Sequence, residues 1–188
     1  MKYIIDTSTW IALVRYYKPF DSNMVILDFF EKKLKNDEFL LIDEVFKECS
    51  FVAKKIVIKE LEFISSKEII TKTSNIYPTK KFFNLLENQF CNKPQRNLLN
   101  DIEIDNFTSN YLNSADAKII LLALDIKNEK DVEKVFIVTE ETSANNDNKL
   151  FKKIPAICKE IDIKSISLPK LIEIFNSEIE ISIKDLNA

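Results

Sequence analysis

Short apolar runs alternate along the chain with longer stretches in which apolar residues recur at helical spacing. The runs 2–5, 39–42, 135–139 and 161–166 are rich in β-branched or aromatic residues, which predicts buried strands. Helices are expected to begin near residues 7 and 154 and to span 22–35, 43–63, 114–124 and 168–175.

Strands and helices that alternate in this way predict an α/β fold, a three-layer α/β/α sandwich with a central, mainly parallel sheet of four to five strands. The stretch from about 65 to 112 is less regular, with an amphipathic helix near 80–90, a break at Pro94 and a further helical pair. We expect this stretch to form an inserted helical lobe, so that residues 1–188 make a single domain. Residues 178–184 alternate Ile with polar groups, which suits an edge strand or a partner contact.

The composition excludes several enzyme classes, because the chain contains no histidine and no glycine. Without histidine there is no Ser-His-Asp or Cys-His nucleophile system and no His-ligated zinc or iron. Without glycine there is no P-loop and no Gly-x-Gly-x-x-Gly turn, and Asn is expected at left-handed turns. Catalysis would have to rest on carboxylates, hydroxyls, amines and bound cations.

Size and charge set further bounds. A chain of 188 residues that is 46% hydrophobic can bury its own core, and Cys49, Cys91 and Cys158 form no Cys-x-x-Cys pair, which predicts buried reduced thiols. No apolar run is long enough for a membrane span, and Asp6 interrupts any signal-peptide region, so a cytoplasmic protein is expected. The net charge of −3 argues against a strongly basic coat for nucleic acid but leaves local patches open.

Four acidic residues occupy positions where side chains of an α/β sheet converge. Asp6 and Glu141 each follow a predicted strand, while Glu48 and Asp116 are expected in the first turns of helices. Parallel strands present their carboxyl ends at one edge, so we expect these acids to lie together, although Asp6 alone also suits a cap for the helix from Thr7. Clustered carboxylates repel unless a cation neutralises them, and oxygen-only ligands favour Mg²⁺ or Mn²⁺.

The sequences around these acids are Ile4-Ile5-Asp6-Thr7-Ser8, Val45-Phe46-Lys47-Glu48-Cys49, Ala115-Asp116 with Ile119 and Ala123, and Val138-Thr139-Glu140-Glu141. In order and spacing they resemble the motifs of the PIN-domain nucleases. The stretch Lys153-Ile154-Pro155-Ala156-Ile157-Cys158 is similar to an uncharacterised PIN-like subfamily in which Ile-Pro-x-x-Cys follows Val-Thr-x-Glu. The resemblance spans almost the whole chain except the lobe. Glu141 departs from the commoner Asp, and the turn glycine before the last catalytic strand is missing, with Asn128 its expected substitute.

The resemblance implies a divalent-metal-dependent endoribonuclease that hydrolyses RNA phosphodiester bonds with one or two Mg²⁺ or Mn²⁺ ions. Asp6 and Asp116 would then be direct metal ligands, while Glu141 and Glu48 would act through water or orient the nucleophile. Supporting roles are expected for hydroxyls that hydrogen-bond the carboxylates, for a competing second-motif acid and for reserve acids. The hydroxyls are those of Ser8 and Thr139. Glu44 is the acid that competes with Glu48, and Glu140 and Asp147 are the reserve acids.

Cations around the cleft are the expected RNA contacts, although surface lysines suit an ordinary solvated face equally well. The candidates are Arg15, Lys18, Lys118 and Lys149, with base stacking on Tyr16 or Tyr17. Small stand-alone PIN proteins are often the toxins of toxin–antitoxin pairs, so the resemblance also implies a cognate antitoxin protein. Whether the chain forms a homodimer stays open.

Other functions fit less well. A haloacid-dehalogenase-type phosphatase needs a second Asp two residues after Asp6, where Ser8 stands, and a receiver domain needs an acid pair after the first strand. The remaining alternative is a catalytically weak or inactive PIN-like module that binds RNA or protein.

Overall fold

The computed structural model describes residues 1–129, 134–143 and 149–179. Their centre is a five-stranded sheet in the order β3-β2-β1-β4-β5, with every neighbouring pair parallel. The strands are β1 (Lys2–Ile5), β2 (Phe39–Ile42), β3 (Ile70–Thr71), β4 (Val135–Val138) and β5 (Lys164–Ile166). The predicted α/β class, with helices on both sides of a parallel sheet, is confirmed.

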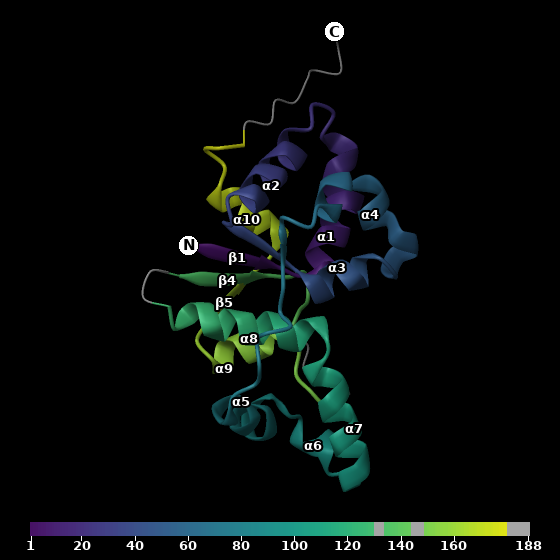
Figure 1. Ribbon diagram of the computed structural model, residues 1–188, viewed down its shortest axis with the longest axis vertical. Helices are drawn as coiled ribbons and strands as arrows, with labels where there is room; N and C mark the ends of the chain where they lie inside the picture. Colours follow the sequence, from purple (N-terminus) through teal and green to yellow (C-terminus); the bar gives the residue numbers. More distant parts are fainter. Residues whose placement is uncertain (130–133, 144–148, 180–188) are drawn as a thin grey trace.

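Helices cover both faces of this sheet (Figure 1). One side carries α1 (Thr7–Ala12), α2 (Val25–Lys35), α4 (Ile56–Glu60) and α10 (Leu168–Ile174), with α3 (Asp43–Cys49) directly after β2. The other side carries α8 (Ala115–Lys127) and α9 (Ile154–Glu160). Short 3-10 or π turns are η1 (Leu13–Tyr17), η2 (Lys18–Phe20), η3 (Val52–Lys55), η4 (Glu62–Ser65) and η5 (Leu86–Phe90).

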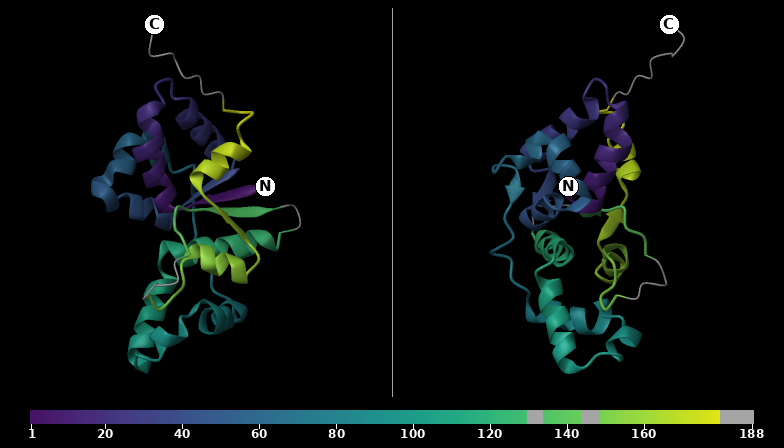
Figure 2. Two further views of the ribbon diagram at one scale, coloured as in Figure 1. Left: turned by 180° about the vertical axis from the view of Figure 1, so that it is seen from behind. Right: turned by 90° about the vertical axis from the view of Figure 1, so that its right-hand side faces the viewer.

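A helical lobe lies beyond α8 and α9, on the side away from the sheet (Figures 1 and 2). It contains α5 (Lys80–Leu85), α6 (Lys93–Arg96) and α7 (Asp101–Leu112). Pro94 lies in the first turn of α6, where its missing N–H costs nothing. The first helix of the lobe begins at Lys80, within the stretch near 80–90 where an amphipathic helix was predicted.

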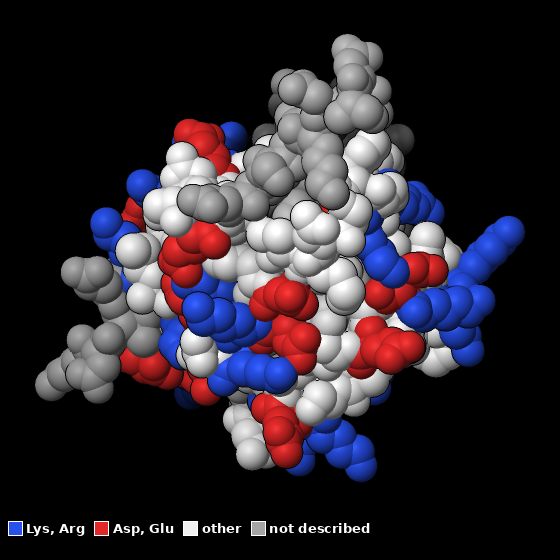
Figure 3. All heavy atoms as spheres, turned by 90° about the horizontal axis from the view of Figure 1, so that it is seen from above, with Lys and Arg blue, Asp and Glu red and all other residues white. Residues whose placement is uncertain are grey.

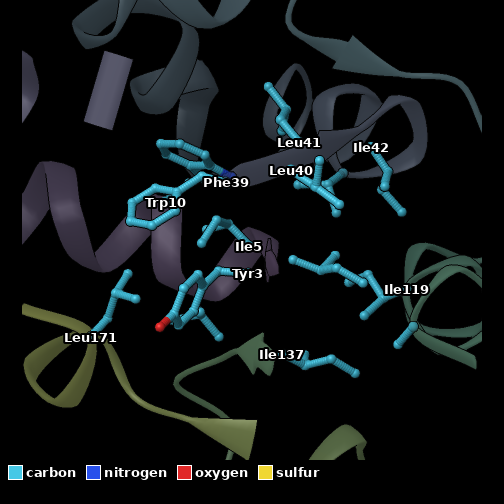
Figure 4. Packing of buried hydrophobic residues seen from close by; sticks show 14 of the residues in the cluster. Tyr3, Ile5, Trp10, Phe39, Leu40, Leu41, Ile42, Ile119, Ile137 and Leu171 are labelled. Atoms are coloured by element: carbon cyan, nitrogen blue, oxygen red, sulfur yellow. The ribbon is translucent and has the colours of Figure 1, made fainter. Parts of the chain in front are cut away.

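The two faces of the sheet differ in chemistry. Tyr3 is in register with Phe39 and Phe136, so the three rings share one face, where the rings of Tyr3 and Phe136 stack with centroids 5.0 Å apart. On the next register level Ile4, between Leu40 and Ile137, points to the opposite face. Figure 4 shows the aromatic side with Trp10 and the aliphatic side with Ile119 of α8. Because both faces are covered at the centre of the sheet, β2 and β4 are apolar throughout and β1 is apolar after Lys2, which made these three strands predictable.

The predicted helix over 43–63 is wrong. It ends at Cys49, and Ala53, Lys54 and Lys55 all have positive φ (47°, 57° and 63°), which no right-handed helix accommodates. The break lets the chain double back, so that α4 packs against α1 and α3 and buries Val57 completely. Tertiary burial thus overrides a locally helical sequence.

Other local predictions also need correction. Strand β3 was not expected, because two residues are too short to show a period, and β5 is shorter than 161–166. None of the left-handed positions in the described ranges is Asn; besides Ala53, Lys54 and Lys55 they are Met24, Asp37 and Asp162. Asn128 has φ −87°, so it is not the expected turn substitute. Of the proposed edge strand, 178–179 are not in a strand and 180–184 lie outside the described residues.

The three cysteines are buried and unbridged, as predicted. Burial raises the pKa of Cys49 and of Cys158 to about 12, so both thiols stay protonated at neutral pH. No helix within the described residues has the length and apolarity to cross a membrane.

Candidate active site

The strand order places a topological switch point at the carboxyl ends of β1 and β4, and this region is called the crevice below. From β1 the chain proceeds to β2 and β3 on one side of the sheet, and later to β4 and β5 on the other. The segments after β1 and β4 lead to helices on opposite faces, α1 and α9 (Figure 1). Such a reversal of strand order is where open α/β sheets bind ligands. Asp6 and Thr139, the residues that follow β1 and β4, lie at this point.

Asp6 is held by a dense set of hydrogen bonds. Its Oδ1 accepts from the Thr7 backbone N–H at 2.7 Å, so Asp6 is the N-cap of α1, a contact that the sequence also suggested. Its Oδ2 accepts from the hydroxyls of Ser8 (2.6 Å) and Thr139 (2.9 Å), the two contacts expected from sequence. The residue is only 5% exposed. Its orientation is therefore fixed from both β1 and β4.

The same hydroxyls shape the backbone after β4. The Ser8 Oγ accepts from the Glu140 N–H at 2.9 Å, and the Thr139 Oγ1 accepts from the Glu141 N–H at 3.1 Å. Glu141 then accepts from the N–H of Ile154 at 3.3 Å, the first residue of α9. A short polar network thus sets where Glu141 lies.

Glu140 contacts a different helix from its neighbour Glu141. Its carboxylate accepts from the N–H of Leu168, at the start of α10, at 2.6 Å, and the residue is exposed. The other predicted reserve acid, Asp147, lies outside the described residues. Glu140 is therefore engaged in a contact with α10.

Glu48 does not lie in the first turn of its helix, as predicted, but in the last turn of α3, because the helix ends at Cys49. Its carboxylate accepts from the Thr7 hydroxyl at 2.6 Å. Burial, and then the charge of Asp6, raise the pKa of Glu48, while hydrogen bonds from Thr7 and from the Ala115 backbone lower it. Glu44, the competing acid, instead pairs with Lys47 at 3.1 Å on the surface.

Asp116 is the second residue of α8, whose first turn is capped by the Ser114 hydroxyl. Burial raises the pKa of Asp116 to about 7, and the charges of Asp6, Glu141 and Glu48 act in the same direction. Burial and Asp6 also raise the pKa of Glu141. Asp6, Glu141 and Glu48, from three other segments, therefore all lie within electrostatic reach of Asp116.

Two participants were missed by sequence reasoning. Thr7 belongs to the Asp-Thr-Ser motif, but its contact with Glu48 depends on how α3 packs on α1. Tyr111 carries no motif. Its hydroxyl is buried, and no described residue offers it a hydrogen bond. Burial, and then Asp116 and Glu141, raise the Tyr111 pKa, and Tyr111 lines the same cavity as Asp116.

The donors in this crevice are carboxylate and hydroxyl oxygens, the type that Mg²⁺ and Mn²⁺ prefer. In the described part of the chain, no three acidic or cysteine side chains are gathered closely enough to hold a metal ion. The donor chemistry fits a hard dication, whereas the side chains in their present positions do not form a ligand cage.

The predicted RNA-contacting cations are dispersed. Arg15 is exposed on η1, Lys18 pairs with Glu60, and the Lys118 ammonium donates to the Ile76 carbonyl at 3.5 Å. Lys149 is the predicted cation that acts on the acids, because its charge lowers the pKa of both Asp116 and Glu141. On the face seen from above in Figure 3, positive and negative side chains are intermixed.

The fold and the crevice together define a doubly wound parallel α/β protein with an acidic cluster at its topological switch point. The chain belongs to the DUF4411 family, a domain of unknown function, whose family model matches residues 3–178. No curated protein and no solved structure matches the chain.

Proposed function

We propose that this protein is a divalent-metal-dependent endoribonuclease of the PIN type, which hydrolyses RNA phosphodiester bonds with Mg²⁺ or Mn²⁺. The observation that carries the proposal is the electrostatics of Asp116, whose pKa is raised to about 7 by burial and by the charges of Asp6, Glu141 and Glu48. Strongly shifted pKa values in a crevice are typical of functional sites. A cation would remove the repulsion that the fold leaves in place.

Each polar residue of the crevice has a distinct role in this proposal. Asp6 and Asp116 would hold the ion, with Asp6 kept in orientation by the Ser8 and Thr139 hydroxyls. Glu141 and Glu48, both partly buried, would orient the attacking water. A bound dication supplies charge neutralisation at the scissile phosphate and lowers the pKa of that water.

Lys149 is the best-placed cation for a phosphate, since its charge already acts on Asp116 and Glu141. Lys118, in the same helix as Asp116, and Arg15 would contact the RNA further away. By analogy with small PIN proteins, the proposal extends to a cytoplasmic toxin whose cognate antitoxin covers the acidic crevice.

Cleavage of end-labelled single-stranded RNA in the presence of Mn²⁺ tests the proposal. Asp116→Asn should reduce cleavage at least about 100-fold, because the variant removes a charge that ion binding requires. Glu31→Gln is the matched control, since Glu31 pairs with Lys35 on α2 and acts on none of the four acids, and it should cleave like the wild type. Wild-type protein that leaves RNA intact in both Mg²⁺ and Mn²⁺, or an Asp116→Asn variant with full activity, would refute the proposal.

One observation favours a second candidate, a catalytically weak or inactive PIN-like module that binds RNA or protein. In the described residues no three acids form a ready ligand group, and both oxygens of Asp6 already accept hydrogen bonds. Calorimetric titration with Mn²⁺ separates the two candidates. A single site that disappears in Asp116→Asn supports the nuclease, and RNA binding without Mn²⁺ binding supports the module.

A further inference from the structure

A cavity of about 690 Å³ opens between the helical lobe and segment 149–153, directly beside the acidic crevice. Its apolar walls are formed by Leu98, Leu99, Phe107 and Phe151. Asp116, one of the four acids, lines the cavity together with Tyr111, whose pKa the acids raise. Its volume is in the range of small-molecule sites. The cavity thus continues the proposed active site into the lobe.

The walls of the cavity are fixed in place. The Tyr111 ring stacks on Phe151 with centroids 4.4 Å apart and an interplanar angle of 30°. Segment 149–153 is tied to the lobe, because the Asn92 N–H donates to the Leu150 carbonyl at 2.7 Å and the Lys152 N–H to the Phe90 carbonyl at 2.9 Å. A ligand would therefore enter a largely preformed site, which lowers the entropic cost of binding.

Polar groups are distributed around these apolar walls. The side-chain amides of Gln95 and Asn110 line the cavity, and each offers both a donor and an acceptor. Lys149 and Lys153 also line it, and their charges reach the acids, since both lower the pKa of Glu141. An occupant should therefore combine a flat apolar body, hydrogen-bonding edges and a negative group near the lysines.

We infer that this cavity receives one unpaired nucleobase of a single-stranded RNA, adjacent to the phosphate held at the acidic crevice. A base has two apolar faces for Phe107 and Leu98, and edges that suit the amides of Asn110 and Gln95. Its phosphate would lie toward Lys149. An apolar peptide side chain fits the walls but would not use the hydrogen-bonding groups of Gln95 and Asn110. The inference rests on the proposed function and gives the lobe a part in substrate selection.

The test measures binding of fluorescent single-stranded tetraribonucleotides, one homopolymer of each base, by anisotropy in EDTA. Leu98→Glu and Ile102→Glu are a matched pair, because the two residues are 76% and 74% exposed in the lobe but only Leu98 lines the cavity. Leu98→Glu should weaken binding roughly 10-fold or more, as expected for loss of base stacking. Ile102→Glu adds the same charge and should change binding less than about twofold.

Asn110→Ala adds a second arm, which should reduce the preference among the four homopolymers. The absence of binding to the wild type, or equal losses in the two Glu variants, would overturn the inference. So would chemical-shift changes at the cavity caused by N-acetyl-phenylalaninamide but not by adenosine monophosphate, which would assign the cavity to a protein partner. Because the anisotropy measurement is made in EDTA, which removes divalent ions, its result does not depend on whether the protein cleaves RNA with Mn²⁺.

Discussion

Two charged clusters at opposite edges of the sheet show opposite electrostatic arrangements. Near the amino end of β2, Lys33 is only 6% exposed, yet its ammonium lies 2.6 Å from Glu38 and 3.1 Å from Glu178. It also lies over the Phe29 and Phe175 rings, 5.4 Å and 4.4 Å from their centroids. At the carboxyl edge, by contrast, buried acids face other acids, with Lys149 as an opposing charge.

The difference separates a structural cluster from a candidate functional one. Burial lowers the pKa of Lys33, but its hydrogen bonds and ion pairs with Glu38 and Glu178 outweigh burial and raise it overall. The positive charge of Lys33 is therefore neutralised by acids of the chain itself. At Asp116 burial and neighbouring charges act together, so folding leaves a repulsion that an external cation would relieve.

Removing Lys33 should produce the largest change in stability. Lys33→Ala takes away a buried cation and its ring contacts, while the half-exposed Glu38 and Glu178 regain water, so we expect a loss of about 2–4 kcal/mol. Lys33→Met keeps the apolar stem and should lose about half as much. Urea unfolding measures both, and two variants as stable as wild type would show that the cluster contributes nothing.

Asp116→Asn should act in the opposite direction in metal-free protein. An acid whose folded pKa is raised from 3.8 to about 7 binds protons more tightly when folded, so wild-type stability falls as pH rises through this interval. Asn stays neutral, so the variant should gain at least roughly 2 kcal/mol at pH 8 and nothing at about pH 3, below both pKa values. A loss of stability at pH 8 would instead make Asp116 a structural residue.

Thr139→Val tests the polar network that joins β1 to β4. The substitution removes the hydroxyl that donates to Asp6 and accepts from the Glu141 N–H, at nearly constant volume. Because Thr139 is 3% exposed, we expect a loss of about 1–2 kcal/mol in thermal or urea unfolding. Ser50→Ala, which removes a hydroxyl bond to Phe46 away from the crevice, is the comparison. Equal losses of unfolding free energy in the two variants would show that the network contributes no more than an ordinary hydroxyl hydrogen bond.

The smallest effect is expected for Glu44→Gln. Glu44 and Lys47 form an exposed pair three residues apart on α3, so its removal should change stability by less than about 0.5 kcal/mol. Glu48→Gln should instead alter stability in a pH-dependent way, because burial and Asp6 raise the pKa of Glu48. If the two variants behaved alike in a pH series of urea unfolding, the structural distinction between these acids would be lost.

Sequence reasoning succeeded where burial is continuous. β1 and β2 were predicted with the bounds that the structure has, and the start of α8 followed from Ser114 as a cap. The positions of Asp6 and Asp116 follow directly from those elements, so this part of the candidate site could be predicted.

Features that depend on long-range packing could not be predicted. After the break that follows α3, α4 packs against α1 and α3 and Val57 is fully buried, while Glu48 lies in the last turn of its helix instead of an early one. Tyr111 lies on a helix without buried residues, so no periodicity marks its contact with Phe151. Local patterns carry no information about contacts of this kind.

Crystals soaked in Mn²⁺ and measured for anomalous scattering test the central claim most directly. The account predicts a peak in the crevice between β1 and β4, in direct coordination with the carboxylates of Asp6 and Asp116, with Glu48 and Glu141 turned toward it. A crevice without a peak at saturating Mn²⁺, or manganese bound only at other surface carboxylates, would contradict it.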